Sequence, residues 1–165
     1  MGPANILFVG KVVFLLILAN GTPVVGKKIF GDKLDMPIDG GLRWSDGQPL
    51  LGKAKTIRGV VLALFVTAGV APIIGIEFIY GALISAAAMA GDLFSSFLKR
   101  RLEISVSGMS IGLDQIPEAL LPALVAKGVL ALTSLDVVAI VVVFFVVDLL
   151  FSRIFFMFKI RDQSY

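Results

Sequence analysis

A carboxylate, two hydroxyls and three cations end a stretch of the chain that is otherwise apolar. They are Asp92, Ser95, Ser96 and the run Lys99-Arg100-Arg101. Placing a charge inside a bilayer costs about 2.5 to 3.5 kcal/mol on insertion scales, so a sequence keeps one mainly where a site needs it. At 3.6 residues per turn, Asp92, a serine and the lysine share one helix face, which Ser85 and Ala88 extend. This pattern predicts a polar groove running inward from the basic end. The small residues 85–91 also permit close helix packing, which is an alternative reason for their presence.

Two further carboxylates begin the next apolar segment. Asp114 and Glu118 are four residues apart, so they can face the same groove as Asp92. Carboxylates from adjacent helices beside a cluster of cations suit magnesium and a polyphosphate. The alternative for the cations alone is that they only set the topology and complement a helix dipole.

A second basic run, Gly52 to Gly59, precedes another apolar segment. Lys55, Thr56 and Arg58 lie at the expected start of a helix, where side chains and free backbone amides can bind phosphate. These cations could instead be only topological anchors. The stretch before them nearly spells a P-loop, but Ala54 occupies the position that requires Ser or Thr and no strand precedes it. We therefore exclude a P-loop.

The composition is that of an integral membrane protein. The chain is 58% hydrophobic, has a mean hydropathy of +0.97 and is only 16% charged. It contains neither cysteine nor histidine, which excludes disulfides, thiolate chemistry, imidazole bases and the usual zinc ligands. A metal ion must therefore be held by oxygen atoms, which favours Mg2+.

Hydropathy predicts an all-α polytopic membrane protein with five transmembrane helices and a polar cavity that faces the cytoplasm. The predicted spans are Ile6 to Val25, Ile57 to Ile74, Ile76 to Leu98, Leu113 to Leu132 and Val137 to Phe158. Residues 1–165 are expected to form a single integral membrane domain. Pro72 and Gly75 predict a tight hairpin between the second and third spans.

The distribution of cations predicts the orientation. The loops at 26–55 and 99–112, the start of the second span at Arg58 and the end of the fifth span together contain 13 of the 15 Lys and Arg residues. The positive-inside rule then predicts a multi-pass protein of the cell membrane with the N-terminus outside and the C-terminus in the cytoplasm. A cleaved signal peptide is not favoured because no cation precedes the first apolar run. Lys11 is expected to snorkel and Asp148 to make a structural contact, for example with Arg153.

Several separated motifs resemble the CDP-archaeol synthases, archaeal membrane enzymes related to bacterial CDP-diacylglycerol synthases. The motifs are Pro37-Ile38-Asp39-Gly40-Gly41, Lys55-Thr56-Ile57-Arg58-Gly59, Gly91-Asp92-Leu93 with Ser95-Ser96, Lys99-Arg100-Arg101 and Leu113-Asp114-Gln115. The resemblance covers most of the chain. It implies transfer of a cytidylyl group from CTP to digeranylgeranylglyceryl phosphate with Mg2+, giving CDP-archaeol and pyrophosphate for ether phospholipid biosynthesis. The partners implied are CTP, this lipid phosphate and membrane lipid, with no nucleic acid.

The chemistry that the resemblance implies assigns roles to individual residues. We expect Asp92, Lys99 and Asp114 to be catalytic, with Asp92 and Asp114 as the metal ligands. Residues expected to bind the nucleotide are Lys55, Thr56, Arg58, Ser95, Ser96, Lys99 and Arg100.

The wider cytidylyltransferase signature is only partly present. Ser96 to Arg100 matches its Ser-x-x-Lys-Arg part, whereas its Lys-Asp pair is missing from Ile104 to Gly108. Gln115 replaces an Arg, and Pro117 stands where the final Asp belongs. Asp92 or Glu118 could replace the missing carboxylate.

Three other functions fit parts of the pattern. A CTP-dependent lipid kinase would use a similar site. A small membrane transporter would also have a polar cavity, but it should show repeated halves. A non-enzymatic assembly subunit would use the small-residue face for helix association.

Overall fold

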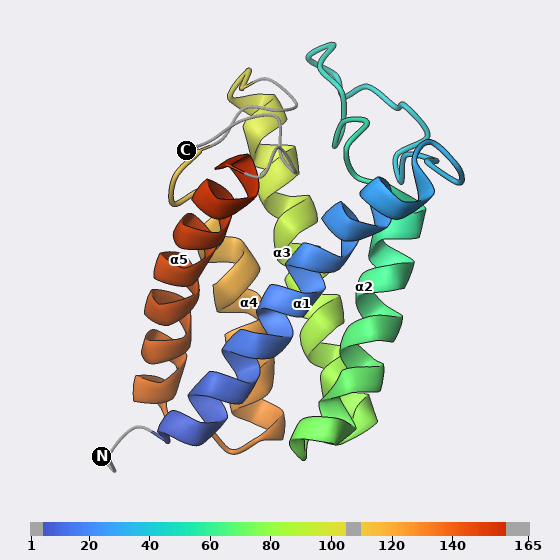
Figure 1. Cartoon of the computed structure of the whole chain (residues 1–165). Helices are drawn as coiled ribbons and strands as arrows, with labels where there is room; N and C mark the ends of the chain where they lie inside the picture. The colour runs from blue at the N-terminus through green and yellow to red at the C-terminus, as the bar shows by residue number, and fades with distance from the viewer. Residues whose placement is uncertain (1–4, 105–109, 158–165) are drawn as a thin grey trace.

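A computed structural model describes residues 5–104 and 110–157, with side chains through residue 151. Its elements are α1 (Ile6–Phe30), α2 (Ile57–Val70), the 3-10 helix η1 (Ala71–Ile74), α3 (Phe78–Arg101), α4 (Gln115–Val129) and α5 (Ser134–Met157). Together the helices form one bundle, in which each runs roughly along the length of the molecule (Figure 1). The predicted all-α class is confirmed for the described part of the chain.

Four of the predicted spans correspond to helices that are long and apolar enough to cross a membrane. These are α1, α2 with η1, α3 and the described part of α5. Their bounds differ from the predicted ones by a few residues, and the predicted end of the last span, Phe158, lies outside the described residues. The chain is therefore a multi-pass membrane protein.

The predicted fourth span is shorter than expected. At 1.5 Å per residue, the 15 residues of α4 reach only about 22 Å, less than the hydrocarbon thickness of about 30 Å. Figure 1 shows that α4 begins part-way along the bundle, whereas α3 extends beyond that point. A fifth full-length transmembrane helix is thus not confirmed. The consequence is that the polar start of α4 is recessed alongside α3.

The connections gather at two ends of the bundle. The start of α1, the turn after η1 and the turn before α5 lie at one end, while the loop that follows α1 and the end of α3 lie at the other (Figure 1). The predicted hairpin is present because Pro72 opens η1 and Gly75 ends it at a positive φ of 74°. The first loop begins at Gly31, later than the predicted residue 26, because α1 continues to Phe30.

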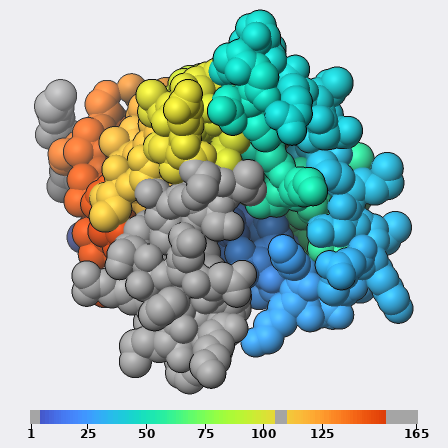
Figure 2. All heavy atoms as spheres, turned by 90° about the horizontal axis from the view of Figure 1, so that it is seen from above, coloured from blue at the N-terminus to red at the C-terminus, as the bar shows by residue number. Residues whose placement is uncertain are grey.

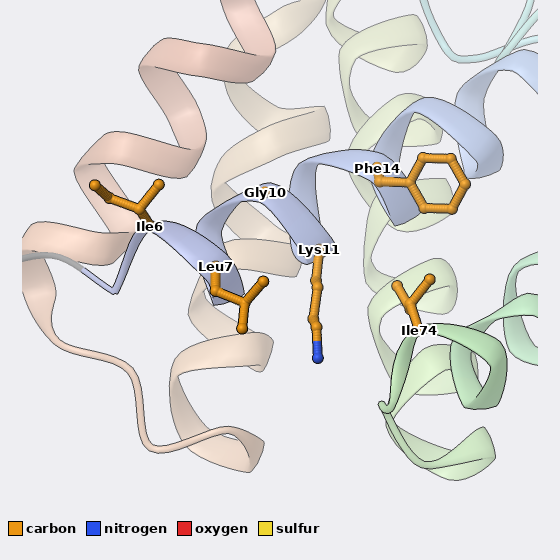
Figure 3. A pocket seen from close by; sticks show the side chains of 6 residues that line it. All are labelled: Ile6, Leu7, Gly10, Lys11, Phe14 and Ile74. Carbon is orange, nitrogen blue, oxygen red and sulfur yellow. The ribbon is translucent and has the colours of Figure 1, made fainter.

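An apolar groove of about 420 Å³ lies at the end that contains the N-terminus. It is lined by Ile6, Leu7, Gly10, Lys11, Phe14 and Ile74 (Figure 3). Lys11 is the only charged residue in this lining, and its ammonium lies 5.3 Å from the centre of the Phe8 ring. The lining is otherwise apolar, unlike the ion pairs described next, and snorkelling of Lys11 stays a prediction.

Candidate active site

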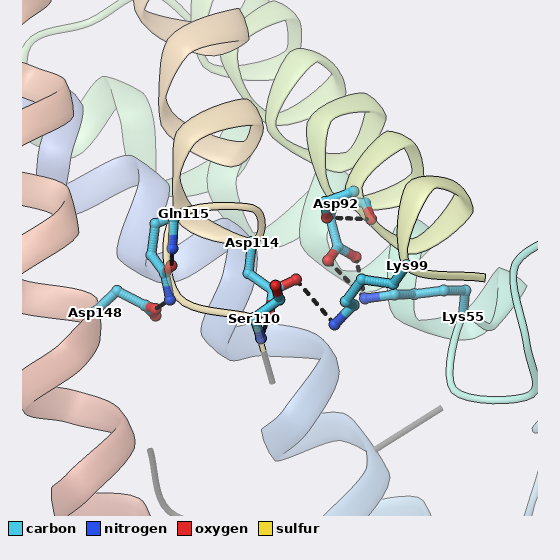
Figure 4. Close-up of polar contacts among 9 residues, drawn as sticks. Lys55, Asp92, Lys99, Ser110, Asp114, Gln115 and Asp148 are labelled. Atoms are coloured by element: carbon cyan, nitrogen blue, oxygen red, sulfur yellow. Dashed lines mark hydrogen bonds and ion pairs between the residues drawn. The ribbon is translucent and has the colours of Figure 1, made fainter. Parts of the chain in front are cut away.

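Lys55 and Asp92 form a bidentate ion pair. Lys55 Nζ lies 2.6 Å from Asp92 Oδ1 and 2.7 Å from Oδ2 (Figure 4). The lysine comes from the loop just before α2, and the aspartate comes from α3. Their side chains are 25% and 20% exposed, so water can reach both. The structure thus brings together two residues that the sequence places in different motifs.

Lys99 and Asp114 form a second ion pair beside the first. Lys99 Nζ lies 2.9 Å from Asp114 Oδ1 (Figure 4). Lys99 belongs to the last turn of α3, and Asp114 is the residue that precedes α4. The other oxygen of Asp114 accepts a hydrogen bond from the Ser110 backbone N–H at 3.2 Å. The predicted meeting of the α3 cations with the carboxylates at the start of α4 is therefore observed.

The charged residues of the two ion pairs and Glu118 form one polar cluster, in which the charges act on one another. Burial lowers the pKa of Lys55, but the negative charges of Asp92, Glu118 and Asp114 outweigh it, so the pKa is raised above its usual value. Lys55 is therefore a full cation at neutral pH. Glu118 also interacts with the Asp92 carboxyl group, which places a second carboxyl group beside the Lys55–Asp92 ion pair.

Gly91 permits the contact between α3 and α4 that assembles these groups. A Cβ atom at this position would lie 2.3 Å from the carbonyl oxygen of Pro117 and 2.9 Å from the Cα atom of Glu118. Only a glycine lets the two backbones approach this closely without a shift of one of them. Asp92 therefore reaches Glu118 because the preceding residue has no side chain.

The other polar residues at the end of α3 point into the protein. Ser95 Oγ donates to the backbone carbonyl of Asp92 at 3.0 Å, and Ser96 and Arg100 are buried. Ser85 and Ala88 have no exposed surface, so the deeper part of the predicted groove is closed by packing. A cavity between Asp92 and the cytoplasm stays a prediction.

Arg58 is held away from the two ion pairs. Its guanidinium donates to the carbonyls of Gly31 and Lys33 and pairs with Asp35 at 3.0 Å. Thr56 caps α2 by accepting a hydrogen bond from the Gly59 N–H at 3.1 Å. Both residues therefore fix how the first loop enters α2, and their predicted contacts with nucleotide remain predictions.

Asp39 organises the first loop in a way that its motif alone did not reveal. Its carboxylate accepts backbone hydrogen bonds from Gly41 at 2.9 Å, Leu51 at 2.9 Å and Gly52 at 3.1 Å. Burial tends to raise the pKa of Asp39, but these hydrogen bonds outweigh burial and lower it. The charged carboxylate thus closes the loop three residues before Lys55. The turn signal at Asp39-Gly40-Gly41 was visible in the sequence, but its partners lie 12 and 13 residues away.

Arg101 fastens the same loop to the end of α3. Its guanidinium pairs with Asp46 at 2.5 Å, donates to the Pro49 carbonyl at 2.7 Å and lies against the rings of Trp44 and Phe97. The two rings meet edge to face at 5.5 Å. Figure 2 shows the cyan loop packed beside the yellow end of α3. Arg101 therefore links the element that carries Lys55 to the one that carries Asp92 and Lys99.

We expect Arg101→Met to loosen this attachment. The substitution removes the ion pair and the carbonyl contact but keeps a flexible apolar side chain against the rings. The loop should become several-fold more sensitive to limited proteolysis, followed by mass spectrometry. Arg43→Met is the matched control, because Arg43 is an exposed arginine of the same loop whose side chain, among the described residues, bonds only to the Gly47 carbonyl. Equal cleavage of the two variants would contradict the role of Arg101.

Asp148 contributes to the edge of the cluster from α5. Its carboxylate accepts a hydrogen bond from Gln115 Nε2 at 3.1 Å, and its charge acts on Glu118 (Figure 4). The predicted structural contact is thus found with Gln115, whereas the Arg153 side chain lies outside the described part. The cost of a carboxylate in an apolar span was the signal that could have placed Asp148 here.

The carboxylates suit a metal ion that substrate phosphates help to bind. Among the described residues, no group of three or more Asp or Glu side chains could hold a metal by itself. Mg2+, however, is usually bound by one or two carboxylates together with substrate phosphates and water. Asp92 and Asp114, which lie on adjacent elements and are both partly exposed, fit that kind of site.

Comparison with known proteins shows the family. The model of the CarS-like CDP-archaeol synthases matches residues 5–165. This chain belongs to the CDP-archaeol synthase family. It is 35% identical to the CDP-archaeol synthase of Sulfurisphaera tokodaii in an alignment of 155 positions that covers 88% of each chain. It is 32% identical to that of Thermococcus onnurineus in an alignment of 127 positions that covers 70% of this chain and 71% of the relative.

A solved structure supports the same conclusion. It is described as an intramembrane enzyme for archaeal membrane lipids biosynthesis, and it matches with a TM-score of 0.68 and 25% identity. The match covers 82% of this chain and 89% of the other. The resemblance to CDP-archaeol synthases that the sequence motifs indicated is thereby confirmed.

Proposed function

We propose that this chain transfers a cytidylyl group from CTP to digeranylgeranylglyceryl phosphate, giving CDP-archaeol and pyrophosphate. The observation that carries the proposal is the pair of Lys–Asp contacts at the recessed start of α4, in a membrane protein of the CDP-archaeol synthase family. This is the part of the bundle where a water-soluble triphosphate and a lipid-anchored phosphate can meet. CTP and the lipid are assigned from the family relatives.

The reaction requires charge stabilisation more than a base. An oxygen of the lipid phosphate attacks the α-phosphorus of CTP, a new P–O bond forms, and the bond to the β-phosphate breaks to release pyrophosphate. The nucleophile is already an anion, so the absence of histidine is no obstacle. Lys55 and Lys99 are placed to neutralise the phosphates, which otherwise repel one another.

Magnesium is proposed as the cofactor, with Asp92 and Asp114 as its protein ligands. When bound, it supplies positive charge that neutralises the triphosphate and the leaving pyrophosphate. Ser95, Ser96, Thr56 and Arg100 are proposed to orient phosphate oxygens, which requires Ser95 to leave its present carbonyl partner. Arg58 is proposed to support the basic loop through its contacts with residues 31–35.

We also propose that the site faces the cytoplasm. The loop between α1 and α2 and the helix ends beside it and at the end of α3 contain ten of the 15 Lys and Arg residues, and they lie at the same end of the bundle as the two ion pairs (Figure 1). The positive-inside rule assigns such an end to the cytoplasm and the N-terminus to the outside. CTP can then reach the site from the cytoplasm.

The proposal is tested with purified protein, CTP labelled in the cytosine, and lipid phosphates of ether and ester type. We expect a labelled CDP-lipid and one pyrophosphate per turnover with the unsaturated ether lipid, and no product after magnesium is chelated by EDTA. Formation of CDP and a phosphorylated lipid from a lipid alcohol would instead identify a kinase. Activity that persists in EDTA would remove magnesium from the mechanism.

A further inference from the structure

The two carboxylates proposed as metal ligands form ion pairs with the two lysines proposed as phosphate ligands. Lys55 contacts both oxygens of Asp92, and Lys99 contacts one oxygen of Asp114. Each lysine therefore interacts with the oxygen atoms that a metal ion would need. Each aspartate likewise neutralises the ammonium group that a phosphate would need.

All four charged groups are partly buried, so each depends on its ion-pair partner for stabilisation. Their side chains are between 12% and 25% exposed. Removing one partner of such a pair leaves an uncompensated charge in poorly solvated surroundings, which is strongly unfavourable. A divalent cation that binds alone must leave an ammonium without its partner. A triphosphate that binds alone must leave a carboxylate without its partner.

We propose that Lys55 and Lys99 act as exchangeable counter-ions that couple metal binding to nucleotide binding. When both ligands bind, Asp92 and Asp114 turn to the metal and the lysines turn to the triphosphate, so every charge keeps an opposite partner. Each ligand then strengthens binding of the other by the same factor. This inference rests on the proposed function, because it takes the nucleotide to be CTP and the metal to be a divalent cation.

The test measures binding without turnover. The full chain in detergent is titrated with Mn2+ as the probe metal, with and without CTP and in the absence of lipid phosphate, and free Mn2+ is followed by electron paramagnetic resonance. Binding of Mn2+ to CTP in protein-free buffer is measured separately and included in the cycle. We expect CTP to tighten Mn2+ binding by about tenfold or more, within the usual range for coupled sites.

Lys55→Met gives the decisive comparison. Exchange requires that the variant bind Mn2+ alone about tenfold more tightly than the wild type, bind CTP more weakly, and lose most of the coupling. Lys53→Met is the matched control, since Lys53 is exposed, lies two residues away and forms no ion pair with any described residue. It should leave Mn2+ binding unchanged.

The outcomes separate this inference from the proposed function. Weaker CTP binding with unchanged Mn2+ affinity would make Lys55 a phosphate ligand only and overturn the exchange. A wild-type chain that binds Mn2+ but no CTP would overturn the proposed function as well. If Lys55→Met fails to fold, Lys99→Met makes the same test at Asp114, where the same increase in Mn2+ affinity is required.

Discussion

Asp92→Asn should abolish formation of the CDP-lipid while the protein remains folded. Asparagine has nearly the same shape, but it lacks the charge that would bind the metal and that now pairs with Lys55. Since a bound metal ion contributes several kcal/mol of charge stabilisation, we expect turnover to fall by about 10³-fold or more. The measurement is release of pyrophosphate with saturating lipid phosphate. Thermal unfolding in detergent reports on the fold.

Asp32→Asn is the matched control for this prediction. Asp32 is an exposed carboxylate in the first loop without an ion pair to any described residue, so this change removes the same charge without disturbing the cluster. Its turnover should equal that of the wild type. Substantial activity in Asp92→Asn would remove Asp92 from the metal site. Asp114 and Glu118 would then be the carboxylates to test.

Hydropathy predicted most of the fold because long apolar runs have few alternatives in a membrane. The helices α1, α2 and α3 lie within a few residues of their predicted spans. The short length of α4 could not be predicted in the same way, because the apolar run continues past its end at Val129 to Leu132. Its recessed position depends on packing against α3 at Gly91, which is a tertiary contact.

Most residues of the candidate site could be predicted from the sequence, but the partners in its ion pairs could not. Asp92, Lys99 and Asp114 were identified because charged groups in apolar segments are costly. Lys55 pairs with Asp92, whereas Arg58 pairs with Asp35. This difference depends on how the first loop folds. Lys55 and Arg58 occur in one short motif, but Lys55 lies in the loop before α2. Helix periodicity therefore does not predict the direction of its side chain.

Arg101 illustrates the same limit for a residue of the basic cluster. In the sequence it resembles its neighbours Lys99 and Arg100, yet its partners are Asp46, the Pro49 carbonyl and two aromatic rings. All of these except Phe97 lie more than 50 residues earlier in the chain. Contacts of that range follow from the closed loop that Asp39 stabilises, and no local pattern specifies them.

Gly91→Ala is expected to impair both the stability and the activity of the protein. The added Cβ would meet the backbone of Pro117 at 2.3 Å, and a backbone atom cannot rotate away as a side chain can. Overpacking of this kind costs about 1 to 3 kcal/mol. It must also move α3 and α4 apart, and displacing catalytic groups by about 1 Å can cost about 10²-fold in rate. Thermal unfolding and pyrophosphate release measure the two effects.

Two other glycines separate these effects. Gly128→Ala in α4 should lower neither the stability nor the turnover, because no described atom outside its own stretch of helix lies within 4 Å of the added Cβ. Gly81→Ala, whose Cβ would lie 2.4 Å from Ala71 Cβ, should lower the unfolding temperature but leave the turnover of the folded fraction nearly unchanged. Gly81 packs against Ala71 in η1, and the turn after η1 lies at the opposite end of the bundle from the last turn of α3, which carries Lys99 (Figure 1). If Gly91→Ala were instead as active per folded molecule as Gly81→Ala, the close approach of α3 and α4 would be needed for folding only. The position of Asp92 beside Glu118 would then have no part in the rate.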